Sequence, residues 1–235
     1  MGTVFSFDVR HDADDAVARA VSWLHHVDEV FSTYRPDSAI SRLARGEVGV
    51  SGCPPEVAQV LALCAHAERH TDGYFTIYPG GRLDPSGLVK GWAIERASLL
   101  LSEAGAPHHC VNGGGDIQLG PAAGPWRIGI ADPTRPGELR TIVTGDDLAI
   151  ATSGSAERGP HVLDPHTGLA AGALLSITLV GPRLTAVDAY ATAAFAMGHA
   201  ARDWVEENDD LEAFAVTAYG DTWQTTGFGA HTVRG

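Results

Sequence analysis

A carboxylate and a hydroxyl stand four residues apart in a segment of small and apolar residues. Asp188 and Thr192 lie within the stretch 186–198, AVDAYATAAFAMG. If this stretch is helical, the two side chains lie on one face, and oxygens at that spacing suit a hard cation such as magnesium. Two other roles stay open, because Asp188 can cap the helix and Thr192 can bond its own backbone.

Two glycine-rich segments could bring backbone amides close to an anionic ligand. Residues 112–117 read NGGGDI, and consecutive glycines allow positive φ angles and a close approach of the main chain. A tight turn between two strands would also explain them. Residues 87–93 read GLVKGWA, with Lys90 at the expected start of a helix, where free amides favour an anion. Lys90 could instead be a solvated first-turn residue, and the segment lacks Walker A spacing.

The segment 161–168, HVLDPHTG, supplies a candidate base. His161 could accept a proton near neutral pH, because an unperturbed imidazole has a pKa of about 6.5. Asp164 precedes Pro165, a pairing more typical of a turn.

Helices that could position these residues are expected mainly in the first half of the chain. Apolar residues recur every three or four positions from 14 to 31, which predicts a helix. Further helices are expected from 54 to about 70 and from 92 to 104. Residues 71–87 are rich in glycine and proline and are expected to form a loop.

Short strands dominate the expectation for the second half of the chain. A helix from 186 to about 197 and a polar helical patch near 204–208 interrupt them. Early helices and late strands predict an α+β fold with a largely antiparallel sheet. The β-prone runs lie at 3–9, 109–111, 116–120, 126–131, 139–145, 148–154, 174–181, 214–219 and 223–228.

Composition limits the classes of partner and of compartment. The 16 Lys and Arg residues against 29 Asp and Glu give a net charge of −13, which argues against a general affinity for nucleic acid or anionic membranes. Cys53, Cys64 and Cys110 form neither a CxxC pair nor an even set, so a reducing compartment, the cytoplasm, is expected. No apolar run approaches the 18 or so residues of a membrane span, so no insertion is expected. The length of 235 residues is consistent with a single domain, which could consist of two lobes.

In their order along the chain, these segments resemble the ApbE family of flavin transferases, which attach FMN from FAD to a Ser or Thr of a partner protein. The resemblance covers roughly residues 1–200 and implies an ApbE-like, T-fold-related α+β domain with FAD in a cleft. It rests on eight blocks in the family's order: MGTVFSF (1–7), FSTYRPDSAISRLARGE (31–47), LDPSGLVKGWAIE (83–95), VNGGGDI (111–117), WRIGIADP (126–133), AIATSGSAER (149–158), HVLDPHTG (161–168) and VDAYAT (187–192).

The resemblance assigns the chemistry to the residues singled out above. It implies Asp188, Thr192 and the backbone carbonyl of Gly87 as magnesium ligands. It implies His161 as the base that deprotonates the acceptor hydroxyl, which attacks the FMN-side phosphate of FAD and displaces AMP. Magnesium would offset the diphosphate charge, which a protein of net charge −13 could not otherwise do well.

The resemblance also implies a set of FAD contacts. Tyr34 is implied as a flavin-stacking residue and Lys90 as a neighbour of the diphosphate. The remaining implied positions form the wall beside the nucleotide and the adjoining cleft: Asn112, Gly113, Gly114, Asp116, Thr152 and Ser153.

Two departures from the family pattern concern the flavin end. FTIY at 75–78 replaces the usual FDxT, so that Thr76 stands in place of an acidic residue, and only about ten residues separate Phe75 from Gly87. A more open flavin pocket is therefore expected. Hydrolysis of FAD to FMN and AMP, or FAD binding without catalysis, remain the alternatives to transfer.

Overall fold

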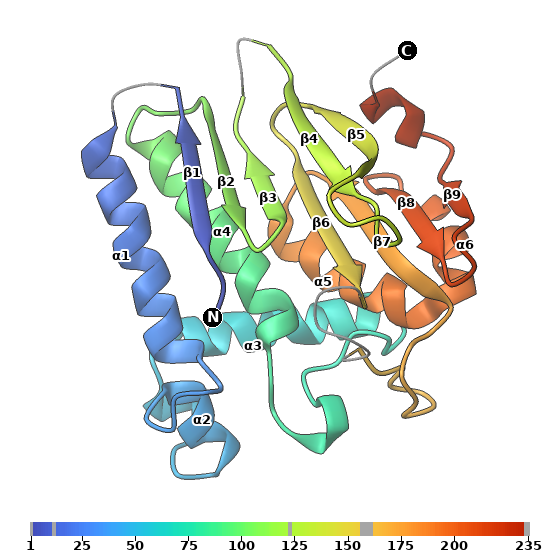
Figure 1. Cartoon of the computed structure of the whole chain (residues 1–235). Coiled ribbons are helices and arrows are strands. Elements are labelled where there is room, and N and C mark those ends of the chain that lie inside the picture. The colour runs from blue at the N-terminus through green and yellow to red at the C-terminus, as the bar shows by residue number, and fades with distance from the viewer. Residues whose placement is uncertain (1, 11–12, 122–123, 156–161, 233–235) are drawn as a thin grey trace.

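An antiparallel sheet, seven-stranded in the part of the chain that the structure describes, forms the centre of the molecule (Figure 1). The structure is a computed structural model and describes residues 2–10, 13–121, 124–155 and 162–232. The strand order is β1-β2-β3-β6-β7-β8-β9, and each neighbouring pair is antiparallel. The strands are β1 (Phe5–Val9), β2 (His109–Gly113), β3 (Asp116–Leu119), β6 (Ala149–Gly154), β7 (Leu174–Gly181), β8 (Glu212–Thr217) and β9 (Thr222–Gln224).

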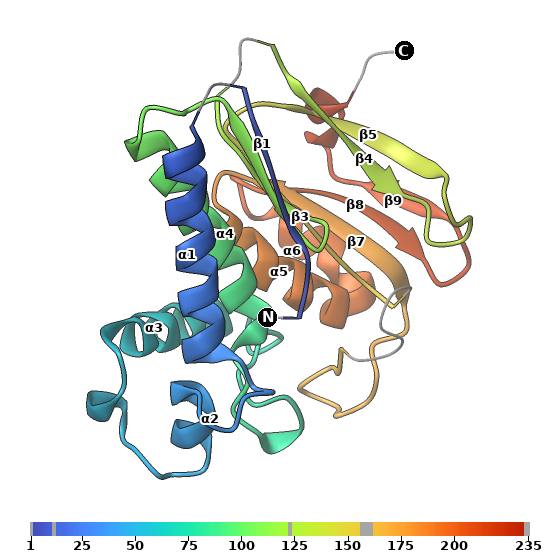
Figure 2. The ribbon, with the colours of Figure 1, turned by 60° about the vertical axis from the view of Figure 1, so that its left-hand side comes forward.

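Helices cover one face of this sheet and a hairpin lies over the other (Figure 2). Two helices pack on the strands, α4 (Ser86–Glu103) and α5 (Leu184–Met197), and α1 (Asp14–Phe31) packs against α4. The hairpin consists of β4 (Trp126–Ala131) and β5 (Leu139–Gly145). The remaining helices are α2 (Ala39–Ala44), α3 (Pro55–His70) and α6 (Ala201–Glu206). Within the described ranges, none of these helices combines the length and the apolar character needed to cross a bilayer.

Residue size alternates along the central strands and sets the spacing of the layers. On β6, Ala151 packs into the core that includes the helices, whereas Ile150 packs into the core that includes the hairpin. On β8, Ala215 and Phe214 divide between the same two cores. Since successive side chains of a strand point to opposite faces, β6 and β8 present small residues to the core that includes α5, itself rich in alanine, whereas β7 between them presents Ile177 and Leu179. The helix can therefore lie close to the sheet.

The α+β class and most elements expected from the sequence are confirmed. The periodic segments at 14–31 and 54–70 form α1 and α3, and the segment at 186–197 forms most of α5. The expected strands are all present, although β9 ends at Gln224 and Phe228 lies in a short 3-10 helix. Most of the expected loop at 71–87 is irregular.

The start of one helix was predicted wrongly, and one short helix was not predicted. α4 begins at Ser86 rather than at Trp92, because Pro85 lies just before the helix, where its missing amide is harmless, and the Asp84 carboxylate accepts a hydrogen bond of 3.0 Å from the Ser86 amide. The short helix α2 was missed. Its start is fixed locally by the Ser38 hydroxyl, which accepts a hydrogen bond of 3.1 Å from the Ser41 amide.

A buried histidine ties α4 to the sheet. His109 of β2 is fully buried, with Nε2 2.7 Å from the Ser98 hydroxyl of α4 and Nδ1 2.7 Å from the Ala106 carbonyl. The carbonyl can only accept, so Nδ1 donates to it, and in the neutral ring Nε2 accepts from Ser98. Burial lowers the pKa of His109 from its ordinary value.

We predict that His109 makes the fold sensitive to mild acid. The folded protein holds this proton more weakly than the unfolded chain, so the free energy of unfolding falls as the pH drops through about 6.5 and below. In urea unfolding at about pH 7.5 and pH 5.5, His109→Gln should lose less stability on acidification than the wild type. His25→Gln, at an exposed position of α1, serves as the control and should keep the wild-type dependence. Identical pH dependence in His109→Gln would contradict the prediction.

Candidate functional site

Glycines let α4 approach α5 closely along one edge. A Cβ atom added at Gly91 would lie 2.7 Å from the Asp188 Cβ, which no real structure tolerates. One turn earlier, a Cβ at Gly87 would lie 3.8 Å from the Thr192 hydroxyl oxygen. The two helices are thus antiparallel, with Gly87 opposite Thr192 and Gly91 opposite Asp188. The expected helical face with Asp188 and Thr192 is present, and it is turned toward the start of α4.

Asp188 lies in a desolvated position between these helices. Its side chain is 5 % exposed, and one carboxylate oxygen accepts a hydrogen bond of 2.8 Å from the Gly91 amide. Burial, with a further contribution from Asp116, raises the pKa of Asp188 to about 7, while Lys90 opposes the shift. Asp188 therefore does not serve as the N-cap of α5, which begins at Leu184.

Lys90 joins Asp188 to a second buried carboxylate. Its ammonium group forms an ion pair with Asp116, at the start of β3, and lies 3.6 Å from an Asp188 oxygen. The Lys90 side chain is 22 % exposed, so Lys90 is not a solvated first-turn residue. When both carboxylates are ionised, one cation between them leaves a formal charge of −1 in a region where charge is costly to bury. Such a centre favours an additional cation.

The next strand extends this cluster. The second oxygen of Asp116 accepts a hydrogen bond of 3.0 Å from the Thr152 amide of β6. The Thr152 hydroxyl lies 2.8 Å from the hydroxyl of Thr178, the residue paired with it on β7. Ser153 follows on β6 and is half-buried. Thr152 is thus held on both sides, and Lys90, Asp116 and Thr152 form one connected group with Asp188.

The three glycines of residues 113–115 form the tight turn between β2 and β3. Gly114 and Gly115 have φ angles of 62° and 92°, which suits the two-residue turn of a hairpin. The Asn112 side-chain oxygen accepts a hydrogen bond of 3.0 Å from the Gly115 amide. Gly113 is needed for packing, since an added Cβ would lie 2.8 Å from Ile94. The turn explains Gly114 and Gly115, and Asp116 follows it directly as the first residue of β3.

The donor set beside this cluster fits a hard divalent cation. Within the described residues, no three His, Cys, Asp or Glu side chains cluster as a metal site. A cation would therefore need neutral oxygens beside Asp188, and the Thr192 hydroxyl and Gly87 carbonyl lie on the facing turns. Oxygen-only sets of this kind suit magnesium.

Among the described residues, the expected flavin contact Tyr34 takes part in none of the interactions above. The Tyr34 side chain lies in the turn after α1 and is 88 % exposed. His161, the expected base, lies outside the described residues, which resume at Val162. Beyond it, Asp164 forms the turn expected from the sequence, because its carboxylate accepts hydrogen bonds from the His166 amide at 2.9 Å and from the Thr167 hydroxyl at 2.9 Å.

Sequence reasoning missed several supporting residues. Gly91 and Thr178 had no assigned role, although the Gly87 to Gly91 spacing and the pairing of two threonines on adjacent strands are visible signals. His166 packs edge-on against Tyr74, with ring centroids 4.4 Å apart. Phe75 is buried and would lie 3.3 Å from a Cβ at Gly87. These contacts anchor the 71–85 loop beside the start of α4.

The comparisons with known proteins all indicate the same family. The family model described as "ApbE family" matches residues 1–81 and 78–215. The chain is 28 % identical over 156 residues to an FAD:protein FMN transferase of Escherichia coli (strain K12), covering 61 % of this chain and 44 % of that protein. It is 27 % identical over 202 residues to an FAD:protein FMN transferase of Rhodobacter capsulatus, covering 81 % and 36 %. The matched part thus spans less than half of either relative.

A solved structure shows the same fold. The flavin transferase ApbE from Vibrio cholerae superimposes with a TM-score of 0.82 over 98 % of this chain and 96 % of that chain, at 21 % identity.

We predict that Gly91→Ala destabilises the protein although alanine is the better helix former. The added methyl group would press against Asp188 and the Leu184 carbonyl, so overpacking should lower the free energy of unfolding by about 1–3 kcal/mol. Urea unfolding measures this effect. Gly172→Ala, where a Cβ would meet nothing within 4 Å, is the control and should change little. Equal stability of the two variants would show that α4 and α5 separate without loss.

Proposed function

The chain belongs to the ApbE family, and on that premise we propose that it is a magnesium-dependent transferase that moves FMN from FAD to a Ser or Thr hydroxyl of an acceptor protein and releases AMP. The observation that carries this proposal is the buried, net negative group of Asp188, Lys90 and Asp116 beside the Thr192 hydroxyl. It offers oxygen ligands to a divalent cation in a chain whose net charge of −13 otherwise repels a diphosphate.

We propose that Asp188, Thr192 and the Gly87 carbonyl hold the magnesium ion. Bound there, the ion would offset the diphosphate charge and polarise a phosphoryl oxygen. The residues around it support this role through their rigidity. Asp188 is held by the Gly91 amide and lies 3.6 Å from the Lys90 ammonium, so its oxygens are oriented before any ligand arrives.

The transfer step needs a base, and the family resemblance gives this role to His161. Its imidazole takes the proton of the acceptor hydroxyl as the hydroxyl oxygen attacks the FMN-side phosphorus of FAD. A phosphoester bond to the acceptor forms, the bond between that phosphorus and the bridging oxygen of the diphosphate breaks, and AMP leaves with the bridging oxygen. The electron pair of the broken bond stays on AMP, and the proton stays on the imidazole until solvent removes it.

The FAD contacts are proposed on the same basis. Lys90 faces the diphosphate, the wall from Asn112 through Gly113 and Gly114 to Asp116 lies beside the nucleotide, and Thr152 and Ser153 line the same cleft. The fixed position of Thr152 between Asp116 and Thr178 supports this assignment, since a rigid wall orients a ligand. Tyr34 stacks on the flavin. Its exposure of 88 % is consistent with an aromatic side chain that is covered only by a ligand.

The state of the three cysteines is informative about the cellular compartment in which the protein works. Cys53, Cys64 and Cys110 are free thiols, which supports our proposal that the reaction takes place in the reducing cytoplasm.

The activity can be tested by incubating the protein with FAD and magnesium and separating the products by chromatography. Release of AMP would exclude an FAD-binding protein without catalysis. Mass spectrometry of added candidate acceptor proteins then distinguishes transfer from hydrolysis, since transfer adds one FMN to the acceptor and hydrolysis leaves FMN free. No AMP in either experiment would contradict the proposed function.

We predict that Asp188→Asn abolishes turnover while the fold survives. The variant removes the charged ligand assigned to magnesium, yet its side-chain oxygen can still accept from the Gly91 amide, and Lys90 keeps Asp116 as its partner. The rate of AMP release should fall by at least about a hundredfold, because the loss of one group that stabilises the transition state usually has an effect of this size. Circular dichroism serves as the control for folding. Normal magnesium-dependent turnover in this variant would remove the proposed metal site.

We predict that His161→Gly separates binding from chemistry. FAD binding needs no proton acceptor, so the affinity for FAD should stay close to that of the wild type, whereas FMN transfer should fall by roughly 10² to 10⁴, the usual contribution of a general base. FAD titration and mass spectrometry of the acceptor are carried out on one preparation. Wild-type transfer by the variant would overturn the base assignment, and loss of FAD binding with a lowered melting temperature would indicate a structural role.

A further inference from the structure

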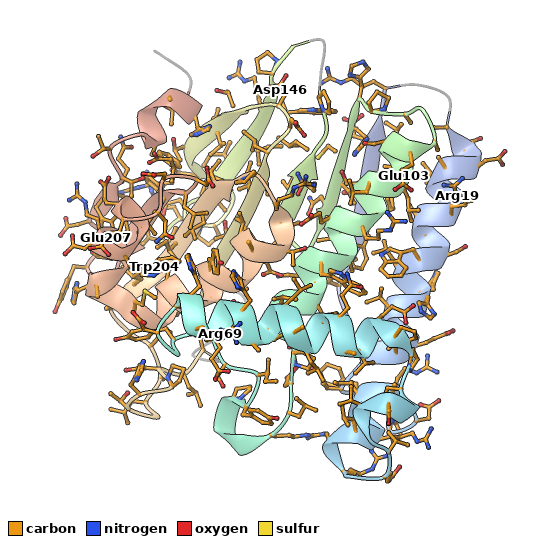
Figure 3. The ribbon with its side chains drawn as sticks, turned by 180° about the vertical axis from the view of Figure 1, so that it is seen from behind. Arg19, Arg69, Glu103, Asp146, Trp204 and Glu207 are labelled. Carbon is orange, nitrogen blue, oxygen red and sulfur yellow. The ribbon has the colours of Figure 1, made fainter. Side chains whose placement is uncertain are left out.

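On the outer side of the helical layer, α3 crosses α4 and α5 (Figure 3). Residues of these three helices, together with Trp23 of α1, line a cavity of about 550 Å³. Its volume is in the range of small-molecule sites. Among the described residues, the cavity lining does not include Asp188, Lys90, Asp116 or Thr152. On α4, Leu88, Trp92 and Glu95 face this cavity, whereas Gly87 and Gly91 face Asp188 and Thr192 on α5. The cavity is therefore a second site, separate from the proposed FAD cleft.

Aromatic and aliphatic side chains form much of the cavity wall. Trp23 of α1 and Trp92 of α4 meet edge to face with ring centroids 5.0 Å apart, and both line the cavity. The Trp23 indole nitrogen donates to the Ala93 carbonyl at 3.1 Å, so its one donor is already used. Leu63 and Leu99 add apolar surface. Such walls bind an apolar or aromatic group, and indole faces also attract cations.

Most charged groups of the cavity already have partners. Glu95 accepts a hydrogen bond of 2.9 Å from the Thr185 amide and lies 3.7 Å from Arg183. Arg96 forms an ion pair of 2.9 Å with Glu103, outside the cavity wall. Each arginine of the wall therefore lies beside a glutamate, which offsets its charge.

Glu56 is the exception. One oxygen of its carboxylate lies 3.2 Å from the His26 ring, whereas the other is buried and accepts no hydrogen bond from any residue that the structure describes. A buried acceptor without a donor costs free energy that a ligand can recover by supplying one. This oxygen is itself covered, but the Glu56 side chain as a whole is 28 % exposed and lines the cavity, so a ligand can engage the oxygen once the carboxylate turns toward the cavity.

We propose that this cavity binds a small organic cation, a primary ammonium group attached to an aromatic or aliphatic group. The ammonium group donates to the Glu56 carboxylate, and the apolar part lies against Trp23 and Trp92. An anion of the same shape would be repelled by Glu56, and the two arginines of the wall already lie beside glutamates. The net charge of −13 adds long-range attraction for a cation. This site does not depend on the proposed transferase activity.

The test is calorimetric titration of the full chain with phenethylammonium, with 3-phenylpropionate as an anion of similar shape. A small ligand of this size should bind with a dissociation constant on the order of 1 mM, and the anion should show no binding up to about 20 mM, where a contact of this strength would be detected. Glu56→Gln should weaken phenethylammonium binding about tenfold, the effect of losing one charged hydrogen bond. Glu207→Gln, at an exposed position that does not line the cavity, is the matched control and should bind as the wild type does.

A second variant keeps the test decisive if Glu56→Gln folds poorly. Ala186→Leu fills part of the cavity and leaves Glu56 in place, so it should also weaken binding. Equal binding of the ammonium and carboxylate probes, unchanged ammonium binding in both variants, or no ammonium binding up to about 20 mM would each overturn the proposal.

Discussion

The contact on which the other features depend is the close packing of α4 on α5 at Gly91. Helices in proteins usually pack with their axes 8–10 Å apart, and a residue without a side chain permits an approach at the near end of this range. Here that approach brings the Gly91 amide within 2.8 Å of the Asp188 carboxylate. It also sets Gly87 opposite Thr192. On β6 and β8, alanines alternate with larger residues. The alanines face the helical side, so α5 can pack close to the sheet. Tight packing therefore comes first, and the buried charges follow from it.

Those buried charges give the site its character. Asp188 and Asp116 are each almost withdrawn from solvent, and the single ammonium of Lys90 lies between them. A fold selected for stability alone would gain from apolar residues at such positions. Retention of a net negative group in a desolvated place is typical of sites that bind cations or move protons. The reaction that we propose comes from the family match, and the electrostatics of these residues are consistent with it.

Local patterns predicted much of this structure, and tertiary contacts account for the rest. The spacing of apolar residues located α1 and α3, and the spacing of Asp188 and Thr192 placed both on one helical face. The six-residue α2 is too short to show periodicity and depends on one cap at Ser38. The start of α4 could not be predicted, because a glycine such as Gly87 usually indicates a loop. In the structure Gly87 is helical, and its missing side chain leaves room for Thr192 of the neighbouring helix α5. No spacing rule could show that Lys90 meets Asp116, since the two come together only when α4 packs on β3. His161 had to be taken from the family resemblance.

The pairing of β1 has a consequence for synthesis on the ribosome. Phe5 pairs with Gly113 and Val9 with His109, so β1 hydrogen-bonds to a strand that is translated about a hundred residues later. At roughly 5–20 residues per second, this separation corresponds to several seconds or more without a partner. During that interval the alternating apolar residues Phe5, Phe7 and Val9 are exposed on an unpaired strand, the kind of segment that associates with other chains. Nascent-chain crowding and chaperone supply, rather than the stability of the finished fold, should therefore limit the yield of this protein when translation is fast.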